Sequence, residues 1–245
     1  MTLDEMTDHH RSASVMQANP ATSAPEVSWA FLPGAGGGST LWEPVAQRFG
    51  GRVLTLPAVD SVPKLADAVE ATVRTMPGRR ILVGNSLGAM VALELAQRVP
   101  VAGLVLVAAG WEFPVSEELI RRVETRGHLV FAESARRCVS PDASPEHLAA
   151  VIEDFQTRTA GTMAAHLRAI RDYEPRLDGA TPRPVTLVLR GGHDRSVTLR
   201  DHVELAERTG GALVPLGSAA HMPFVDHGDE VAAWLERLRA FVVAR

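Results

Sequence analysis

Cysteine and lysine are scarce in this chain of 245 residues, which contains one of each. Cys138 alone can form no intramolecular disulfide, and it cannot contribute to a zinc site built from several cysteines. Lys64 stands against 24 arginines, which is a bias of composition without chemical meaning. Long apolar runs are missing too, because none approaches the roughly 20 residues that a membrane helix requires. The sequence therefore predicts neither a disulfide scaffold nor a membrane-spanning protein.

The chain also lacks a surplus of positive charge. Its formal net charge is -4, its pI is near 6.1, and no block of Lys and Arg is present, so neither nucleic acid nor an anionic membrane surface is expected as a partner. Residues 1–26 have no apolar core after a basic start and are not expected to be a secretory signal. Their polar composition with Ala, Ser and Pro predicts a flexible N-terminal segment. A cytoplasmic location is the default prediction.

Short apolar runs alternate with amphipathic segments from residue 27 onward, which is typical of an α/β fold. Hydrophobic residues make up 46% of the chain, enough for one domain with a large core. The runs expected to be buried strands are 27–32, 52–56, 80–84, 103–109, 185–191 and 212–216. Helical spacing is found at 64–76, 87–99, 198–208 and 229–243. Because helices join most of the strands, we predict a mainly parallel sheet with helices on both faces.

This alternation is interrupted between residues 111 and 182. The region has several helix patterns and no convincing strand, and Ser144 stands as an N-cap before Pro145. We predict a helical cap at 111–182, inserted into an α/β core formed by 27–110 and 183–245. Ligands of parallel sheets bind beyond the carboxyl ends of the strands, so a helical insertion at that edge would cover the site.

The stretch Gly84-Asn85-Ser86-Leu87-Gly88 lies between a strand pattern and a helix pattern. This is the context of the G-x-S-x-G nucleophile elbow, in which glycines allow a sharp turn and the serine is strained with its hydroxyl in the cleft. The serine also precedes a helix N-terminus, whose free N–H groups and dipole favour an oxyanion. We therefore predict Ser86 as a nucleophile. The structural alternative is a tight-turn or N-cap serine.

A serine nucleophile needs a general base, and the base needs an acid that orients it. Asp194 follows the predicted strand that ends at residue 191, and His221 follows the one that ends at residue 216. Both are therefore expected at the same sheet edge as Ser86, and the order Ser, Asp, His is the one that this mechanism uses on such sheets. We predict His221 as the base and Asp194 as the acid. Glu112 is the alternative acid.

A glycine-rich loop, residues 34–38, follows the first predicted strand. Such a loop can turn a backbone N–H into the cleft, and we predict that the N–H groups of Ala35 and Leu87 form an oxyanion hole. A phosphate-binding loop for a dinucleotide is the alternative. It is disfavoured because Ser39 occupies the last position of G-x-G-x-x-G and no acidic residue ends the strand at 52–56. The carboxylates show no metal-ligand spacing, so neither cofactor nor metal is predicted.

Four motifs, PGAGGG, GNSLG, GGHD and AHMPF, together resemble those of the α/β-hydrolase fold family, and the similarity covers residues 27–245. The resemblance implies cofactor-free cleavage of esters, thioesters, lactones or activated C–C bonds beneath a cap. It also implies that a Ser nucleophile argues against the dehalogenases and epoxide hydrolases of the family, which use Asp. Two features depart from the family pattern. Pro33 stands where many relatives carry a His, and little chain precedes Val27 for the usual first strand pair, so either the sheet is shortened or the leader supplies edge strands.

The predicted function is a cofactor-free serine hydrolase that cleaves a small-molecule carboxylic ester, lactone or thioester through an acyl-enzyme. Three alternatives stay open: a C–C hydrolase or lyase with the same triad, an acyl-carrier thioesterase, and a non-catalytic ligand receptor. The first is suggested by Asn85, because an Asn before the nucleophile resembles the pattern of C–C-cleaving hydrolases. Substrate identity and oligomeric state are not predicted. The candidate pocket residues are Trp111, Phe113, Phe155 and Met222.

Overall fold

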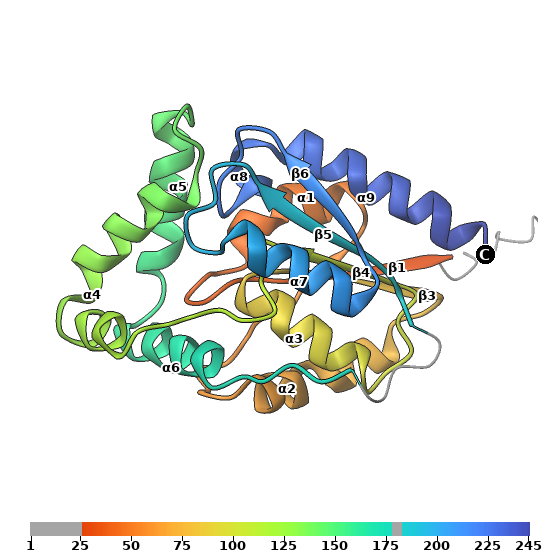
Figure 1. Cartoon of the computed structure of the whole chain (residues 1–245), viewed down its shortest axis with the longest axis horizontal. Coiled ribbons are helices and arrows are strands. Elements are labelled where there is room, and N and C mark those ends of the chain that lie inside the picture. The colour runs from red at the N-terminus through yellow and green to blue at the C-terminus, as the bar shows by residue number, and fades with distance from the viewer. Residues whose placement is uncertain (1–25, 178–182) are drawn as a thin grey trace, which may run out of the picture.

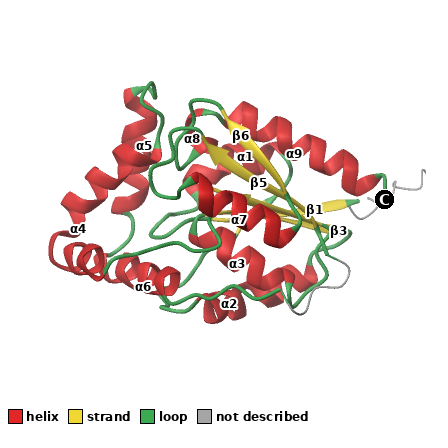
Figure 2. Ribbon diagram, viewed as in Figure 1, coloured by secondary structure: helices red, strands yellow, loops and turns green. Residues whose placement is uncertain are grey.

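A parallel sheet forms the centre of the fold. Within the part of the chain that the computed structural model describes, residues 26–177 and 183–245, six strands form one sheet in the order β2-β1-β3-β4-β5-β6. Each strand runs parallel to its neighbours. The strands are β1 (Val27–Leu32), β2 (Arg52–Val53), β3 (Arg79–Asn85), β4 (Gly103–Val107), β5 (Val185–Gly191) and β6 (Ala212–Leu216). The predicted α/β fold with a mainly parallel sheet is confirmed (Figure 2).

Two strands are shorter than their sequence patterns predict. β2 lies at the edge of the sheet and ends at Val53, although Leu54 N–H still donates to the carbonyl of Phe31 at 2.8 Å. Leu54 and Leu56 are buried in the core, so the apolar pattern continues beyond the end of the strand because these residues are buried. β4 ends before Ala108, whose φ of 50° is incompatible with extended backbone.

Helices cover both faces of the sheet. Figure 1 shows α1 (Glu43–Arg48) and α9 (Gly228–Val243) on one side and α2 (Val62–Thr75), α3 (Leu87–Ala96) and α7 (Leu199–Thr209) on the other. β3 and β4 are apolar and almost entirely buried because both of their faces are covered. The short elements η1 (Thr40–Trp42), α1 and α8 (Pro223–Asp226) were not predicted, since three to six residues give no helical period to recognise.

The segment between β4 and β5 contains, in its described part, three helices and no strand. They are α4 (Glu117–Cys138), α5 (Pro145–Gln156) and α6 (Ala160–Arg171), which we call the cap helices. In Figure 1 they lie beyond the end of the sheet toward which the strand arrows point. α4 bends at Arg126, which has φ of -139° and ψ of 33°. Ser144 caps α5 as predicted, accepting a hydrogen bond from His147 N–H, with Pro145 as the first helical residue.

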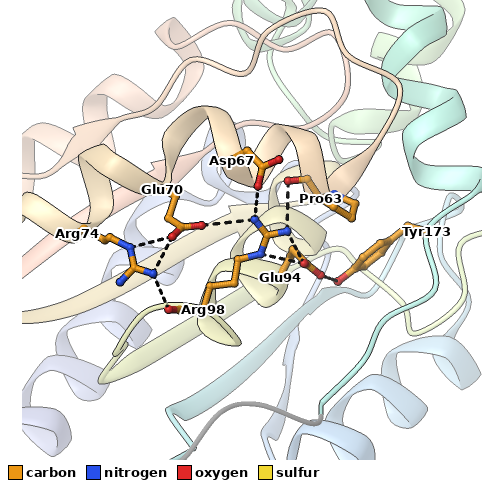
Figure 3. Close-up of polar contacts among 7 residues, drawn as sticks. All are labelled: Pro63, Asp67, Glu70, Arg74, Glu94, Arg98 and Tyr173. Carbon is orange, nitrogen blue, oxygen red and sulfur yellow. Dashed lines mark hydrogen bonds and ion pairs between the residues drawn. The ribbon is translucent and has the colours of Figure 1, made fainter.

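The chain leaving the cap helices is attached to the core through α3. The Tyr173 hydroxyl donates to Glu94 Oε2 of α3 at 3.1 Å, and Arg98 donates to Glu94 Oε1 at 2.7 Å (Figure 3). Arg98 also pairs with Asp67 and Glu70 of α2. This network therefore joins α2, the helix that begins after Ser86, and the segment that follows α6.

Residues 1–25 and 178–182 lie outside the described part of the chain, so the predicted flexible segment 1–26 is described only at Glu26. The Glu26 carbonyl accepts a hydrogen bond from Arg79 N–H at 3.0 Å. Of the helices in the described part, none has both the length and the apolar character needed to span a bilayer.

Candidate active site

Ser86 occupies a strained turn between β3 and α3. Its φ of 53° and ψ of -118° are unusual for a residue with a side chain, and such conformations cost about 1–3 kcal/mol. Its N–H donates to the Val107 carbonyl at 2.9 Å, which fixes the turn to the neighbouring strand. A Cβ at Gly84 would lie 2.2 Å from the Gly88 carbonyl oxygen, and one at Gly88 would lie 2.1 Å from that of Leu32. Glycine is therefore required at both positions for helix and strand to approach.

His221 and Asp194 form a buried pair. His221 Nδ1 lies 3.1 Å from Asp194 Oδ2 and 3.2 Å from Oδ1, and the two residues are 6% and 7% exposed. A carboxylate can only accept, so His221 donates through Nδ1–H and its Nε2 is left with a free lone pair. Asp194 Oδ1 also accepts from Ser196 N–H at 2.8 Å. Burial alone would raise the pKa of Asp194, but the charge and hydrogen bond of His221, with the Ser196 bond, outweigh it and hold that pKa below its ordinary value.

The alternative acid, Glu112, is not placed for this role. Its side chain is exposed, whereas the histidine ring is bonded to the carboxylate of Asp194. The geometry therefore pairs His221 with Asp194.

Ser86 and His221 line one cavity of about 280 Å³. The hydrogen bonds within residues 26–177 and 183–245 do not include one between Ser86 Oγ and His221 Nε2. Such bonds are often long or poorly aligned before substrate binds and tighten in the substrate complex. Ser86 and His221 thus line the same cavity but are not hydrogen-bonded to each other in this structure.

The walls of this cavity are mainly apolar and come from both the core and the cap helices. Phe113, Phe155 and Met222, predicted as pocket residues, are part of the lining. Trp111, the fourth predicted pocket residue, is not part of the lining: its backbone N–H donates to the backbone carbonyl of Asp201 in α7, and the Arg208 guanidinium carbon lies 4.7 Å from the centre of its ring. The remaining apolar lining side chains are Pro114, Val115, Leu119, Val123, Val130, Phe131, Met163, Leu167 and Ile170.

The glycine-rich loop is held by the cap helices. Gly36 N–H donates to His166 Nδ1 at 3.1 Å and Gly38 N–H donates to Asp154 Oδ2 at 2.7 Å. In the described part of the chain no hydrogen bond uses the N–H of Ala35, which lines the cavity. Leu87 is the first residue of α3, so its N–H has no acceptor within the helix. The two predicted oxyanion donors therefore remain available.

His166 and Asp154 were not predicted as site residues. The His166 ring is 1% exposed, and its Nε2 lies 2.7 Å from the Pro57 carbonyl, which can only accept. The ring therefore donates through Nε2–H and accepts at Nδ1 from Gly36. Burial lowers the pKa of His166, which favours this neutral form, and burial raises the pKa of Asp154. Helical spacing from Met163 places His166 on the inner face of α6. The sequence could therefore have predicted that His166 is buried, but not that it binds the glycine-rich loop.

Asn85 fixes the histidine loop from behind the elbow. Its Nδ2 donates to the His221 carbonyl at 2.9 Å and to Val107 at 3.3 Å, and the side chain is fully buried. His202 of α7, also fully buried, donates through Nδ1 to the Thr198 carbonyl at 2.7 Å. Its Nε2 lies 4.0 Å from Asp194 Oδ2, and burial lowers the pKa of this histidine. The carboxylate of Asp194 thus lies between the rings of His202, whose lowered pKa favours the neutral form, and His221.

In the described ranges, no group of three or more His, Cys, Asp and Glu side chains is arranged to hold a metal ion.

The fold and these motifs define a known class of protein. The family model described as the alpha/beta hydrolase family matches residues 30–234. The chain belongs to the alpha/beta hydrolase family, and the prediction of an enzyme of this family is confirmed.

Solved structures show the same fold at low sequence identity. The enol-lactonase from Burkholderia xenovorans LB400 is 19% identical with a TM-score of 0.76, covering 88% of this chain and 92% of that one. A thermophilic esterase is 22% identical with a TM-score of 0.77, covering 87% and 90%. The type II thioesterase BorB from the borrelidin biosynthetic cluster is 20% identical with a TM-score of 0.67, covering 90% and 94%. No curated protein matches the chain.

Proposed function

We propose that the protein is a serine hydrolase that cleaves a small carboxylic ester, lactone or thioester, with Ser86 as nucleophile, His221 as base and Asp194 as the orienting acid. One observation carries this proposal above the others. The His221 ring, fixed through Nδ1 by a buried carboxylate, lines the same cavity as the strained Ser86. This is the constellation in which a serine hydroxyl becomes reactive.

The reaction proceeds in two halves. His221 Nε2 takes the hydroxyl proton as Ser86 Oγ attacks the carbonyl carbon, and the N–H groups of Ala35 and Leu87 stabilise the oxyanion. His221 then gives the proton to the leaving alcohol or thiol, and an acyl-enzyme remains. Water enters, gives its proton to His221 and attacks the acyl carbon. Collapse of the second intermediate returns the proton to Ser86 and releases the carboxylic acid.

The cap helices and the core have different tasks in this proposal. The core, residues 27–110 and 183–245, supplies the reacting groups, and the region 111–182 supplies most of the apolar cavity wall. The enol-lactonase, esterase and thioesterase among the similar structures support a carboxylic acid derivative as substrate, each title being a statement about that protein. The apolar lining favours an apolar acyl group.

Hydrolysis of aryl esters of graded acyl length tests the proposal. Ser86→Ala should lower kcat by several orders of magnitude, as loss of such a nucleophile does, while the free energy of unfolding does not fall. Ser61→Ala is a suitable control, because Ser61 makes no capping bond and does not line the cavity. Undiminished turnover by Ser86→Ala would exclude Ser86 as nucleophile.

The same panel separates the competing activities. An acyl thioester tests the carrier thioesterase, and a vinylogous diketone tests the C–C hydrolase. A non-catalytic receptor would turn over none of these substrates.

A further inference from the structure

The charged side chains at the reactive cavity are all positive. Of the described residues that line the cavity, Arg137 and Arg195 are the ones of the Arg, Lys, Asp and Glu types. They also line an adjoining hollow of about 210 Å³, together with Arg136 and His193. Neither lining includes Asp or Glu, although the chain as a whole has 29 acidic against 25 basic residues.

Arg137 and Arg195 differ from two arginines near the start of α4, which are paired. In α4, Arg121 pairs with Glu118, and Arg122 pairs with Glu133 at 2.6 Å. No ion pair within the described ranges involves Arg136, Arg137 or Arg195. Other arginines of the described ranges, such as Arg126 and Arg158, also make no ion pair, but Arg137 and Arg195 are the unpaired ones that line the cavity.

The two arginines come from different parts of the fold. Arg137 lies in the last turn of α4, and Arg195 lies in the loop after β5, one residue beyond Asp194. The end of α4 is itself bonded to the histidine loop, because the Cys138 carbonyl accepts from Met222 N–H at 2.7 Å. An anion held by both guanidinium groups would therefore bridge a cap helix and the core beside the reacting groups.

We propose that the substrates are amphipathic anions: an apolar acyl portion fills the cavity, and a carboxylate or phosphate elsewhere in the same molecule binds Arg137 and Arg195. This inference rests on the proposed hydrolase function and adds a substrate class to it. A guanidinium group binds a carboxylate or a phosphate through two parallel N–H donors. A guanidinium group without a carboxylate partner also attracts anions by its charge before they make contact. The net negative charge of the whole chain does not prevent an anion from binding at this site, because salt screens charges that lie more than about 10 Å away.

Paired substrates test the proposal. A p-nitrophenyl hemiester of a dicarboxylic acid is compared with the neutral p-nitrophenyl ester of the same chain length, and a phosphate-bearing acyl thioester is compared with its neutral analogue. The anionic member of at least one pair should show about tenfold higher kcat/KM, the advantage that one charge-assisted contact provides, and should lose it as ionic strength rises. A preference in either pair supports the proposal and identifies the anion.

Variants separate recognition from chemistry. Arg137→Gln and Arg195→Gln should each bring the ratio of kcat/KM for the anionic ester to kcat/KM for the neutral ester close to one, mainly by raising KM for the anionic ester. Arg137→Lys and Arg195→Lys should keep part of the anion preference, because they keep the positive charge. Arg122→Gln on the same helix is the control, because its guanidinium pairs with Glu133, and it should keep the full preference.

Two failures can be told apart. If the wild-type protein hydrolyses neutral and anionic esters equally well, or if Arg137→Gln and Arg195→Gln keep the preference, the anion site is wrong and the hydrolase stands. If no ester is hydrolysed, binding of the hemiester to Ser86→Ala by calorimetry still tests the site. Tighter binding than by the Ser86→Ala, Arg195→Gln double variant supports the site, and equal binding overturns it.

Discussion

Replacing His166 by glutamine should lower kcat while leaving KM nearly unchanged. His166 Nδ1 accepts the Gly36 N–H at 3.1 Å, and Gly36 follows Ala35, the proposed oxyanion donor. Glutamine can place its terminal amide near the Pro57 carbonyl, but it has no acceptor where Nδ1 lies. The Gly36 N–H would lose its partner in a buried setting, and the loop would no longer hold Ala35 in place.

The magnitude follows from the burial of this bond. A buried donor left without an acceptor costs about 1–3 kcal/mol, which corresponds to roughly 5- to 150-fold if the whole cost falls on the transition state. Complete loss of an oxyanion donor costs about 10²- to 10³-fold in kcat, which sets the upper limit. We expect a fall in kcat of about 10- to 100-fold, because the loop is displaced and not removed.

His166→Asn is the matched control. Its side-chain oxygen can lie where Nδ1 lies and accept from Gly36, although the bond to Pro57 is lost. Kinetics on an aryl ester should show most of kcat retained by asparagine and lost by glutamine, and a boronic acid that mimics the tetrahedral intermediate should lose affinity in parallel with kcat. Equal losses in both variants, or a kcat within about twofold of wild type in His166→Gln, would refute the loop-positioning role.

Three further outcomes are expected. Asp154→Asn should raise the free energy of unfolding at pH 8 but not below pH 3.8, the ordinary pKa of Asp. Burial raises the pKa of Asp154, so the carboxyl ionises at a lower pH in the unfolded state than in the folded state, and the stability of the wild-type protein falls as pH rises between the two pKa values. Urea unfolding at pH 8 and below pH 3.8 measures this, and an equal difference between variant and wild type at both pH values would contradict it. Burial raises the pKa of Cys138 to about 12, so iodoacetamide at pH 8 should alkylate it far more slowly in the native protein than in urea, and equal rates would disprove its protonated, buried state. Tyr173→Phe removes the donor to Glu94 and should cost about 0.5–1.5 kcal/mol of stability by the same unfolding assay, whereas no loss would show that this bond does not attach the cap helices.

The sequence predicted the sheet well because buried parallel strands consist of apolar runs, as β3 and β4 do. It overextended β2, which ends at Val53: Leu54 adds one hydrogen bond to Phe31 of β1, and Leu54 and Leu56 are buried in the core beyond the end of the strand. Local patterns cannot distinguish these two reasons for an apolar run.

The candidate site divides in the same way. Ser86, Asp194 and His221 each follow a strand, so the order of strands was enough to bring them to one sheet edge. His166 and Asp154 reach the glycine loop only because the cap helices dock on the core, which no local pattern describes. Trp111 was misplaced for a related reason, since the direction of its side chain depends on contacts with α7.

Mass spectrometry of the protein after reaction with a fluorophosphonate measures most directly whether His221 activates Ser86. A single adduct that maps to Ser86, absent in Ser86→Ala and formed about a hundredfold or more slowly in His221→Ala, is the expected result. No adduct on wild-type protein, or labelling of Ser86 at the same rate without His221, would contradict it.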